Sequence, residues 1–174
     1  MGILKDLTKE YFGEKVRKED EINIEGLDVD IVSFTDNNGK KHKKGYKPKE
    51  IYSLKILLKR MIEVRGDDGD FNDIDTSEIE DMEELFKGNE TFNGDISGWD
   101  VSRVRNMHGM FSGATSFNQP IGKWDVSSVK NMSFMFRKTT SFNQDISKWN
   151  IQGVNVYNMF KDCPIKDEYK PKME

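Results

Sequence analysis

The stretch that decides the fold is Phe117-Asn118-Gln119-Pro120-Ile121-Gly122-Lys123-Trp124-Asp125-Val126-Ser127. Related copies begin at Phe92 and at Phe142, so their starts are evenly spaced on either side of Phe117, and each copy runs on into a segment rich in Met and Phe. Repeats of about 20–30 residues each form one unit that buries its apolar face only by stacking on its neighbours. The sequence therefore predicts a solenoid.

Two degenerate units flank the three copies. Upstream, Ile74-Asp75-Thr76-Ser77 occupies the Trp-Asp-Val-Ser columns, and downstream a Met-Phe segment at 155–160 arrives one position early with no further unit behind it. Within a unit, Val104, Met107, Met110 and Phe111 have the spacing of a short amphipathic helix. Glycines follow the segment where a left-handed cap would need them, and a short strand is expected around each repeat isoleucine. The fold class is therefore α/β, with about four repeats of strand, turn and short helix.

The columns of Met, Phe and Trp are interpreted as stacked core, because so short a period supplies few other apolar side chains. The Asn93, Asn118 and Asn143 column is typical of an asparagine ladder, in which the side chains bond the backbone of the turn. Cys163 falls in a column with Ala114 and Thr139, so we expect it to be a small packed residue.

The region before the repeats has its own pattern. Residues 1–20 predict an amphipathic helix, and the alternation around residues 27–31 with Asn37-Asn38-Gly39 predicts a β-hairpin. Pro48 and an apolar stripe that ends before Gly66 predict a helix that caps the first repeat. The predicted domains are an N-terminal helix and hairpin region at 1–46, a capping helix at 47–66, the repeats at 67–163 and a tail at 164–174.

The repeat motifs Phe-Asn-Gln-Asp-Ile-Ser-Lys-Trp-Asn at 142–150 and Trp-Asp-Val-Ser-Ser-Val-Lys-Asn-Met-Ser-Phe-Met-Phe at 124–136 resemble the BspA-like leucine-rich-repeat surface-protein family of bacteria. The resemblance covers about residues 47–163. It implies a leucine-rich-repeat-like solenoid used for adhesion or protein binding, with no catalytic residues to transfer. Most relatives carry an export signal and many more repeats, and this chain as given has neither, so we expect a cytoplasmic protein.

Composition narrows the function. The chain has 174 residues, a net charge of −4, one cysteine and two histidines, which excludes an internal disulfide and any multi-cysteine zinc site. No window is apolar enough for a membrane span. The acidic segment departs from an EF-hand at Asp73 and Ile79, and no nucleotide-binding or hydrolase motif is present. We expect no metal, no cofactor and no enzymatic activity.

Charge is segregated beside the predicted capping helix. Residues 40–60 hold nine Lys or Arg against Glu50 alone, while residues 67–84 hold ten acidic residues and no basic one. Three readings stay open: the blocks face each other, the basic block contacts an acidic protein, or the segment Lys40–Arg60 binds nucleic acid. The candidate basic patch comprises Lys40, Lys41, Lys43, Lys44 and Lys47.

We expect a non-enzymatic module that presents a rigid repeat surface to a protein partner, pre-organised so that binding costs little ordering entropy. Polar side chains of adjacent repeats would form this surface. The candidates are Asp95, Ser97, Gln119, Lys123, Gln144, Asp145, Ser147 and Lys148. The module could be an intracellular inhibitor or immunity-type factor, and the alternatives are a fragment of a cell-surface adhesion protein or nucleic-acid binding. It is expected to be a monomer or to self-associate weakly through an uncapped solenoid end.

Overall fold

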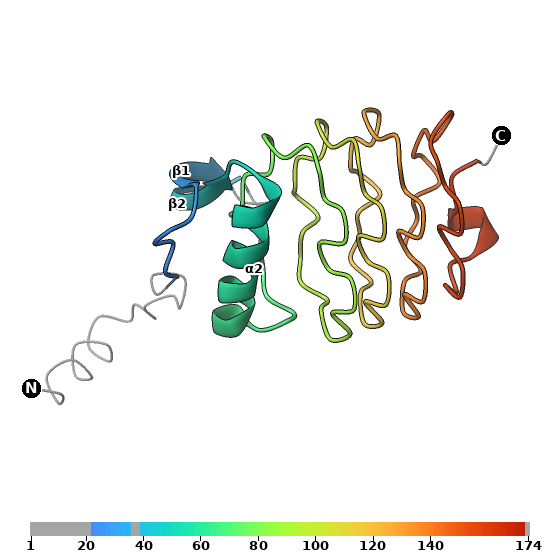
Figure 1. The fold of residues 1–174 in the computed structure, drawn as a ribbon, viewed down its shortest axis with the longest axis horizontal. Helices are drawn as coiled ribbons and strands as arrows, with labels where there is room; N and C mark the ends of the chain where they lie inside the picture. Colours follow the sequence, from blue (N-terminus) through green and yellow to red (C-terminus); the bar gives the residue numbers. More distant parts are fainter. Residues whose placement is uncertain (1–21, 36–38, 173–174) are drawn as a thin grey trace, which may run out of the picture.

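The computed structural model describes residues 22–35 and 39–172 (Figure 1). Its regular elements are strands β1 (Val29–Thr35) and β2 (Lys41–Pro48), the helix α2 (Ile51–Arg65) and a short 3-10 helix, η2 (Asp167–Tyr169). Chain coils follow α2 and lie side by side up to the C-terminal end (Figure 1). The helix predicted for residues 1–20 lies outside the described residues. The proposed division into domains stays a prediction.

Strands β1 and β2 pair antiparallel and confirm the predicted hairpin. The register runs from Val29 opposite Pro48 to Thr35 opposite Lys41, with an irregularity between Val32 and Phe34. On its far side, β2 reaches the repeats: the Tyr46 N–H donates to the Asp73 carbonyl, and the Asp75 N–H donates to the Tyr46 carbonyl, both at 2.8 Å. The hairpin is thereby attached to the first coil.

Helix α2 begins at Ile51, shortly after Pro48, and is confirmed where the apolar stripe predicted it. The Glu50 carboxylate caps it by accepting from the backbone N–H groups of Tyr52 and Ser53, at 2.8 and 2.7 Å. Gly66 ends it at a φ of +86°, with its N–H donated to the Ile62 carbonyl. Its buried side chains enter the same core as the coils; they are Leu54, Leu57, Leu58 and Met61.

Successive coils are joined by main-chain hydrogen bonds between residues one repeat apart. Isolated parallel bridges link Asp81 to Asn106, Asn106 to Asn131, and Asn131 to Asn155. We call the four stretches at these bridges the Met–Phe segments: residues 81–88, 106–113, 131–138 and 155–162. Each earlier segment donates four N–H groups to carbonyls of the next one, over 2.8–2.9 Å.

The predicted fold class is wrong. Among the described residues there is one α-helix and one two-stranded antiparallel sheet, and both precede the repeats. Residues 67–163 contain isolated bridges and turns but none of the strands and short helices predicted for each repeat. The leucine-rich-repeat-like α/β solenoid of strand-turn-helix units is therefore replaced by irregular coils held by these bridges.

The Met–Phe segments are not helical because every fourth residue is left-handed. Backbone φ is +58° at Gly109 and +76° at Gly113, and it is +58° at both Phe134 and Lys138. An α-helix requires φ near −63° throughout. The chain instead turns at every fourth position, which returns side chains to one face at spacings of three and four. An amphipathic helix has the same spacing of apolar side chains, so the sequence pattern could not distinguish a helix from a coil of four-residue turns.

The core consists of aromatic columns that run along the stack, as the repeat pattern predicted. One column contains Phe86, Phe111, Phe136 and Phe160, with ring centroids 5.5, 5.6 and 5.8 Å apart and planes within 7° of parallel. A second column contains Phe92, Phe117 and Phe142. The two columns are in contact, with the ring centroids of Phe111 and Phe117 only 3.9 Å apart. The Met and Trp columns are buried beside them. Offset ring stacking adds to the burial of these large side chains.

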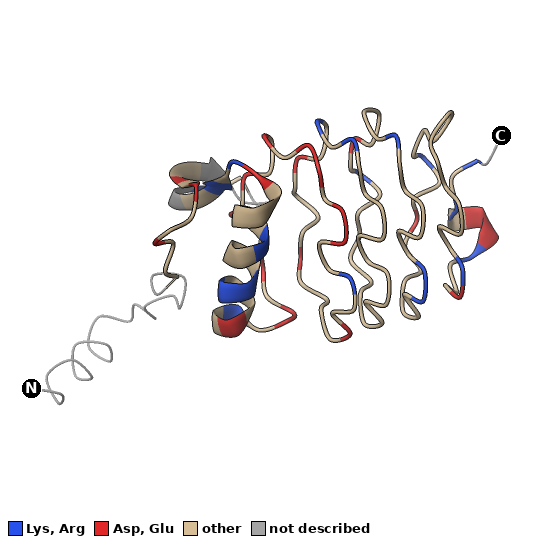
Figure 2. Cartoon of the chain, viewed as in Figure 1, with Lys and Arg blue, Asp and Glu red and all other residues tan. Residues whose placement is uncertain are grey.

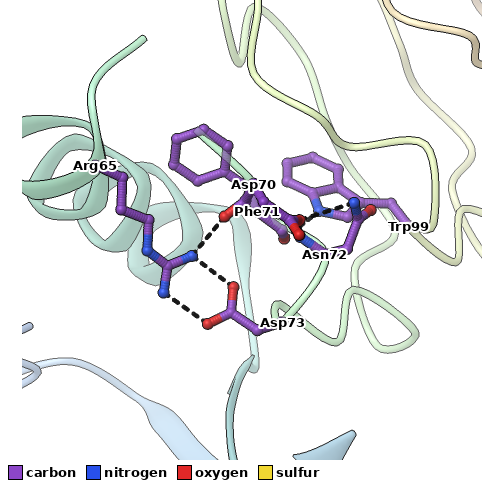
Figure 3. A network of polar contacts seen from close by, with 6 residues as sticks. All are labelled: Arg65, Asp70, Phe71, Asn72, Asp73 and Trp99. Atoms are coloured by element: carbon purple, nitrogen blue, oxygen red, sulfur yellow. Dashed lines mark hydrogen bonds and ion pairs between the residues drawn. The ribbon is translucent and has the colours of Figure 1, made fainter. Parts of the chain in front are cut away.

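Arg65, the last residue of α2, fastens the helix to the first coil (Figure 3). Its two terminal nitrogens donate to both carboxylate oxygens of Asp73 at 2.7 Å, and Nη1 also donates to the Asp70 carbonyl. The two side chains are only 7% and 10% exposed. The guanidinium lies over the Phe71 ring, 5.9 Å from its centroid. A bidentate contact of this kind fixes orientation as well as distance, so it sets the angle at which α2 meets the repeats.

Candidate protein-interaction face

The aspartates and serines predicted to bind a partner instead form matching turns. Asp95 Oδ1 accepts from the Ser97 N–H at 2.9 Å and from its hydroxyl at 2.7 Å. Asp145 and Ser147 repeat these contacts two coils later, at 3.0 and 2.6 Å. Burial acts to raise the pKa of Asp95, but these hydrogen bonds outweigh burial and hold the pKa below its usual value. These side chains stabilise the coil; Asp145 is exposed, and Asp95, Ser97 and Ser147 are half-buried.

The glutamines of the predicted surface belong to the asparagine ladder, which is confirmed. Asn118 accepts at Oδ1 from the Asn143 N–H at 3.0 Å, and Asn93 accepts in the same way from the Asn118 N–H at 2.9 Å. Gln119 Nε2 donates to the Asn93 carbonyl and Gln144 Nε2 to the Asn118 carbonyl, at 2.7 and 3.0 Å. The glutamine amides are therefore already occupied.

Lys123 and Lys148 are the two predicted binding residues that project freely. Both are exposed, and neither ammonium has a hydrogen bond or ion pair within residues 22–35 and 39–172. Lys148 lines a cavity of about 300 Å³ with Trp149, Gln152 and Lys172. Of the eight predicted residues, these lysines are the ones whose charged groups remain available.

The predicted basic patch is partly neutralised by the acidic block. Lys47 forms ion pairs with Asp75 at 3.4 Å and Glu78 at 3.3 Å, and Lys49 forms ion pairs with Asp30 at 2.7 Å and Glu78 at 3.3 Å. Hydrogen bonds from Lys49 and Lys47 hold the pKa of Glu78 below its usual value, and the Asp75 charge raises the pKa of Lys47. Lys40 and Lys41 are exposed, while the side chains of Lys43 and Lys44 lie outside the described part. The two charge blocks thus face each other in part.

A face that sequence reasoning missed lies on the Met–Phe segments. Phe134 lies between His108, with ring centroids 5.7 Å apart, and Tyr157, with centroids 5.3 Å apart, both edge-on. The Arg137 guanidinium lies 5.7 Å from the Phe134 ring centroid. Tyr157 is 65% exposed. We call these four residues, His108, Phe134, Arg137 and Tyr157, the aromatic face.

Phe134 is held in a costly conformation. Its φ is +58°, which for a bulky residue is an outlier, and the matching position of the preceding coil is Gly109. Strain of this kind costs on the order of 1–3 kcal/mol, and the equivalent residues Glu84 and Asn158 of other segments share it, with φ of +54° and +52°. The backbone therefore tolerates an unfavourable residue where a ring is placed at the surface between two other aromatic rings.

A shallow cavity of about 180 Å³ adjoins the aromatic face. Glu84, Lys87 and Ser112 line it together with His108, Phe134 and Arg137. The Ser133 hydroxyl donates to Asn131 Oδ1 at 2.7 Å and lies 2.8 Å from His108 Nδ1. Because Ser133 has given away its only hydroxyl hydrogen, Nδ1 must carry the proton and donate. His108 is thus fixed in one orientation with its other nitrogen, Nε2, unused in this contact.

One group of side chains could approach a cation. Glu83, Glu84 and His108 offer ligand atoms that all lie within 4.8 Å of one another. The Lys87 ammonium already donates to Glu84, and the Asn106 amide donates to Glu83 at 2.9 Å. Each of these contacts occupies one oxygen of its carboxylate, so the group is hydrogen-bonded as it stands.

These features define a protein of stacked, repeating coils with a half-buried aromatic and basic face from which Tyr157 is exposed. Residues 56–170 match a family described as "Mycoplasma protein of unknown function, DUF285", and the chain belongs to that family. No curated protein and no solved structure matches the chain. Among the described residues, no helix has the length and apolar character needed to cross a membrane.

Proposed function

We propose that the protein is a non-enzymatic module that binds a protein partner through the aromatic face. The observation that carries this proposal is the strained Phe134, which is surrounded by His108, Arg137 and the exposed Tyr157. Tyrosine and arginine dominate the binding energy of protein interfaces, and aromatic residues are enriched there. The stacked coils would supply a rigid support, so that little entropy is lost on binding.

The His–Ser pair of this region supports a non-enzymatic reading. A nucleophilic serine must give its hydroxyl hydrogen to the histidine that activates it. Here the Ser133 hydroxyl donates to Asn131, and His108 Nδ1 donates to Ser133. The direction of the hydrogen bonds is opposite to that of a catalytic pair.

The neutralised lysines favour a protein partner over nucleic acid. Phosphate binding relies on clustered cations that are free to replace counterions. Lys47 and Lys49 are each shared between two carboxylates, which reduces what the basic segment could offer. We also propose that the chain is a relative of the BspA-like surface proteins, on its Phe-Asn-x-x-Ile-Ser-x-Trp motif and its membership of the DUF285 family.

The test is retention of a partner from lysate of the source organism on the immobilised full chain, at low and at moderate salt. Tyr157→Ala should reduce retention of the partner by at least about tenfold, as expected for an interface hot spot. Tyr52→Ala is the matched control, since Tyr52 on α2 is also 65% exposed. Equal retention by the wild type and Tyr157→Ala would refute the role of the aromatic face. Recovery of nucleic acid that is lost at moderate salt would refute the choice of partner.

A further inference from the structure

The Met–Phe segments pass their hydrogen bonds in one direction. In each of the first three segments, alternate residues donate their N–H groups toward the following coil. The donors in the third segment, for example, are Met132, Phe134, Phe136 and Lys138, and the acceptors are the carbonyls of Asn155, Tyr157, Met159 and Lys161. Bonds that run the other way lie at the start of the segments or outside them, as from Lys130 N–H to the Arg105 carbonyl and from Ser141 N–H to the Thr115 carbonyl. Each of these segments therefore donates four N–H groups to the coil that follows it.

The last Met–Phe segment has the same donors and no coil beyond it. Its equivalent N–H groups belong to Val156, Asn158, Phe160 and Asp162, and none of them has a hydrogen-bond partner within the described part of the chain. We call this row the donor edge. The tail bonds to the preceding repeat: the Tyr169 carbonyl accepts from Ile146 N–H, and the Lys166 N–H donates to Asn143. At the edge itself, the Lys170 ammonium lies 5.9 Å from the Phe160 ring centroid. The side chains of Tyr157, Lys161 and Asp162 are exposed along the edge.

The chemistry of the donor edge restricts what can bind there. The carbonyls of Asn155, Tyr157, Met159 and Lys161 point back to the preceding coil, where they accept its hydrogen bonds. The edge therefore offers donors without the alternating acceptors of an ordinary β-strand edge. A partner must therefore supply oxygen acceptors at these positions. An N–H group of the partner placed there would face an N–H group of the edge and could not pair with it.

Charge along the stack points to the same kind of partner. Residues 67–100 contain 13 acidic residues and one basic residue, Lys87, whereas residues 101–172 contain 11 basic residues and five acidic ones. Figure 2 shows acidic residues gathered in the coils next to α2, basic residues spread over the later coils, and acidic residues again at η2. The donor edge thus lies in the more basic part of the array, which favours an acidic ligand, and the edge itself carries Asp162 beside Lys161.

From these observations we infer that the donor edge binds an extended acidic segment of a protein partner, whose backbone carbonyls and carboxylates accept its four N–H groups. A second copy fits less well, because the acidic first coil is already covered. Helix α2 packs against that coil (Figure 1) and buries Leu54, Leu57 and Met61 in the core that the two share. The inference does not rest on the aromatic face, since main-chain groups carry it.

The experiment titrates the full chain with a fluorescein-labelled peptide of alternating Glu and Val, and follows both anisotropy and amide exchange by NMR. The peptide should bind with a Kd below about 1 mM and should slow exchange at Val156, Asn158, Phe160 and Asp162. Lys161→Glu places a negative charge on the edge and should weaken binding at least about fivefold at low salt. Lys59→Glu makes the same charge change at an exposed site on α2, away from the donor edge, and should leave binding within about twofold.

Absence of binding, absence of protection at those four amides, or equal effects of the two lysine variants would overturn the inference. Protection of the same amides in the free chain, together with a mass that rises with concentration in sedimentation, would assign the edge to a second copy instead. Equal binding of single-stranded DNA of the same charge would show a general anion surface and would also overturn it. Because the readout is at the edge amides, failure here would leave the Tyr157 test unaffected.

Discussion

Gly109→Ala separates the observed coil from the helix that the sequence pattern predicts. In an α-helix, replacing an interior glycine by alanine stabilises the fold by about 0.5–1 kcal/mol. In the structure Gly109 has a φ of +58°, and forcing an L-residue with a Cβ into this region costs about 1–2 kcal/mol. The nearest atom to the added Cβ would be Glu84 Cγ at 3.5 Å, an ordinary contact. Backbone strain is therefore the only large term, and the two structures predict opposite signs.

Urea unfolding followed by the fluorescence of the three tryptophans measures this difference, since all three are buried in the coils. We expect the free energy of unfolding to fall by about 1–2 kcal/mol, which for a chain of this size lowers the Tm by roughly 2–4 °C per kcal/mol. An unchanged or increased stability of Gly109→Ala would refute the left-handed assignment.

Lys138→Gly is the mirror control. Lys138 is exposed and adopts a φ of +58°, so glycine relieves strain of about 1–2 kcal/mol and loses about 0.5–1 kcal/mol through greater freedom of the unfolded chain. The net effect should be neutral to stabilising by about 1 kcal/mol. In a helix the same change would cost up to about 1 kcal/mol. A clear loss of stability in this variant would contradict the coil.

Two further predictions concern the polar groups of the coils. Asn118→Ala should lower the free energy of unfolding by about 1–3 kcal/mol in urea, because the Asn143 N–H loses its acceptor at 3.0 Å. Asn118→Asp retains an acceptor and should recover most of this loss. Equal losses in the two variants would argue against the ladder. The free energy of unfolding should also decrease as the pH is lowered into the acid range. The pKa of Asp95 is lowered in the folded chain, because the Ser97 hydrogen bonds outweigh burial. The stabilisation from Asp95 is therefore complete above the usual carboxyl pKa of about 3.9 and is lost as the pH falls through the lower folded value. Urea midpoints measured from about pH 6 to pH 3 should decline less steeply in Ser97→Ala than in the wild type, and parallel curves would contradict this assignment.

The apolar columns could be predicted from sequence because burial repeats at the period of the fold. Phe111, Phe117 and Trp124 each have a counterpart at the same position of the next repeat, and any stacking of the units must bury them together. Helix α2 could be predicted because its start, its stripe and its final Gly66 are local signals. The local path of the Met–Phe segments could not be predicted, because spacings of three and four arise from helices and from four-residue turns alike.

The site residues illustrate the same division. Gln119 and Gln144 were expected to face a partner, but each follows an asparagine of the ladder and donates to the previous coil. Lys123 and Lys148 share one column and are exposed, and their side chains make no such bond in the described part of the chain. The rings of the aromatic face lie in two columns where the repeat varies: Glu83, His108, Ser133 and Tyr157 form one, and Glu84, Gly109, Phe134 and Asn158 the other. An aromatic residue in a variable column was the available signal.

The departure from helical geometry also creates the chemistry of the last coil. A helix satisfies its N–H groups within its own turns, so stacked helices would leave no row of donors between units. Left-handed residues at every fourth position instead direct four N–H groups of each segment toward the next coil. The array must then end in unpaired donors unless something follows it, and Val156, Asn158, Phe160 and Asp162 are that end. The correction to the predicted fold and the proposed binding edge therefore have one cause, the φ values of the Met–Phe segments, so a stabilising result for Gly109→Ala would weaken both.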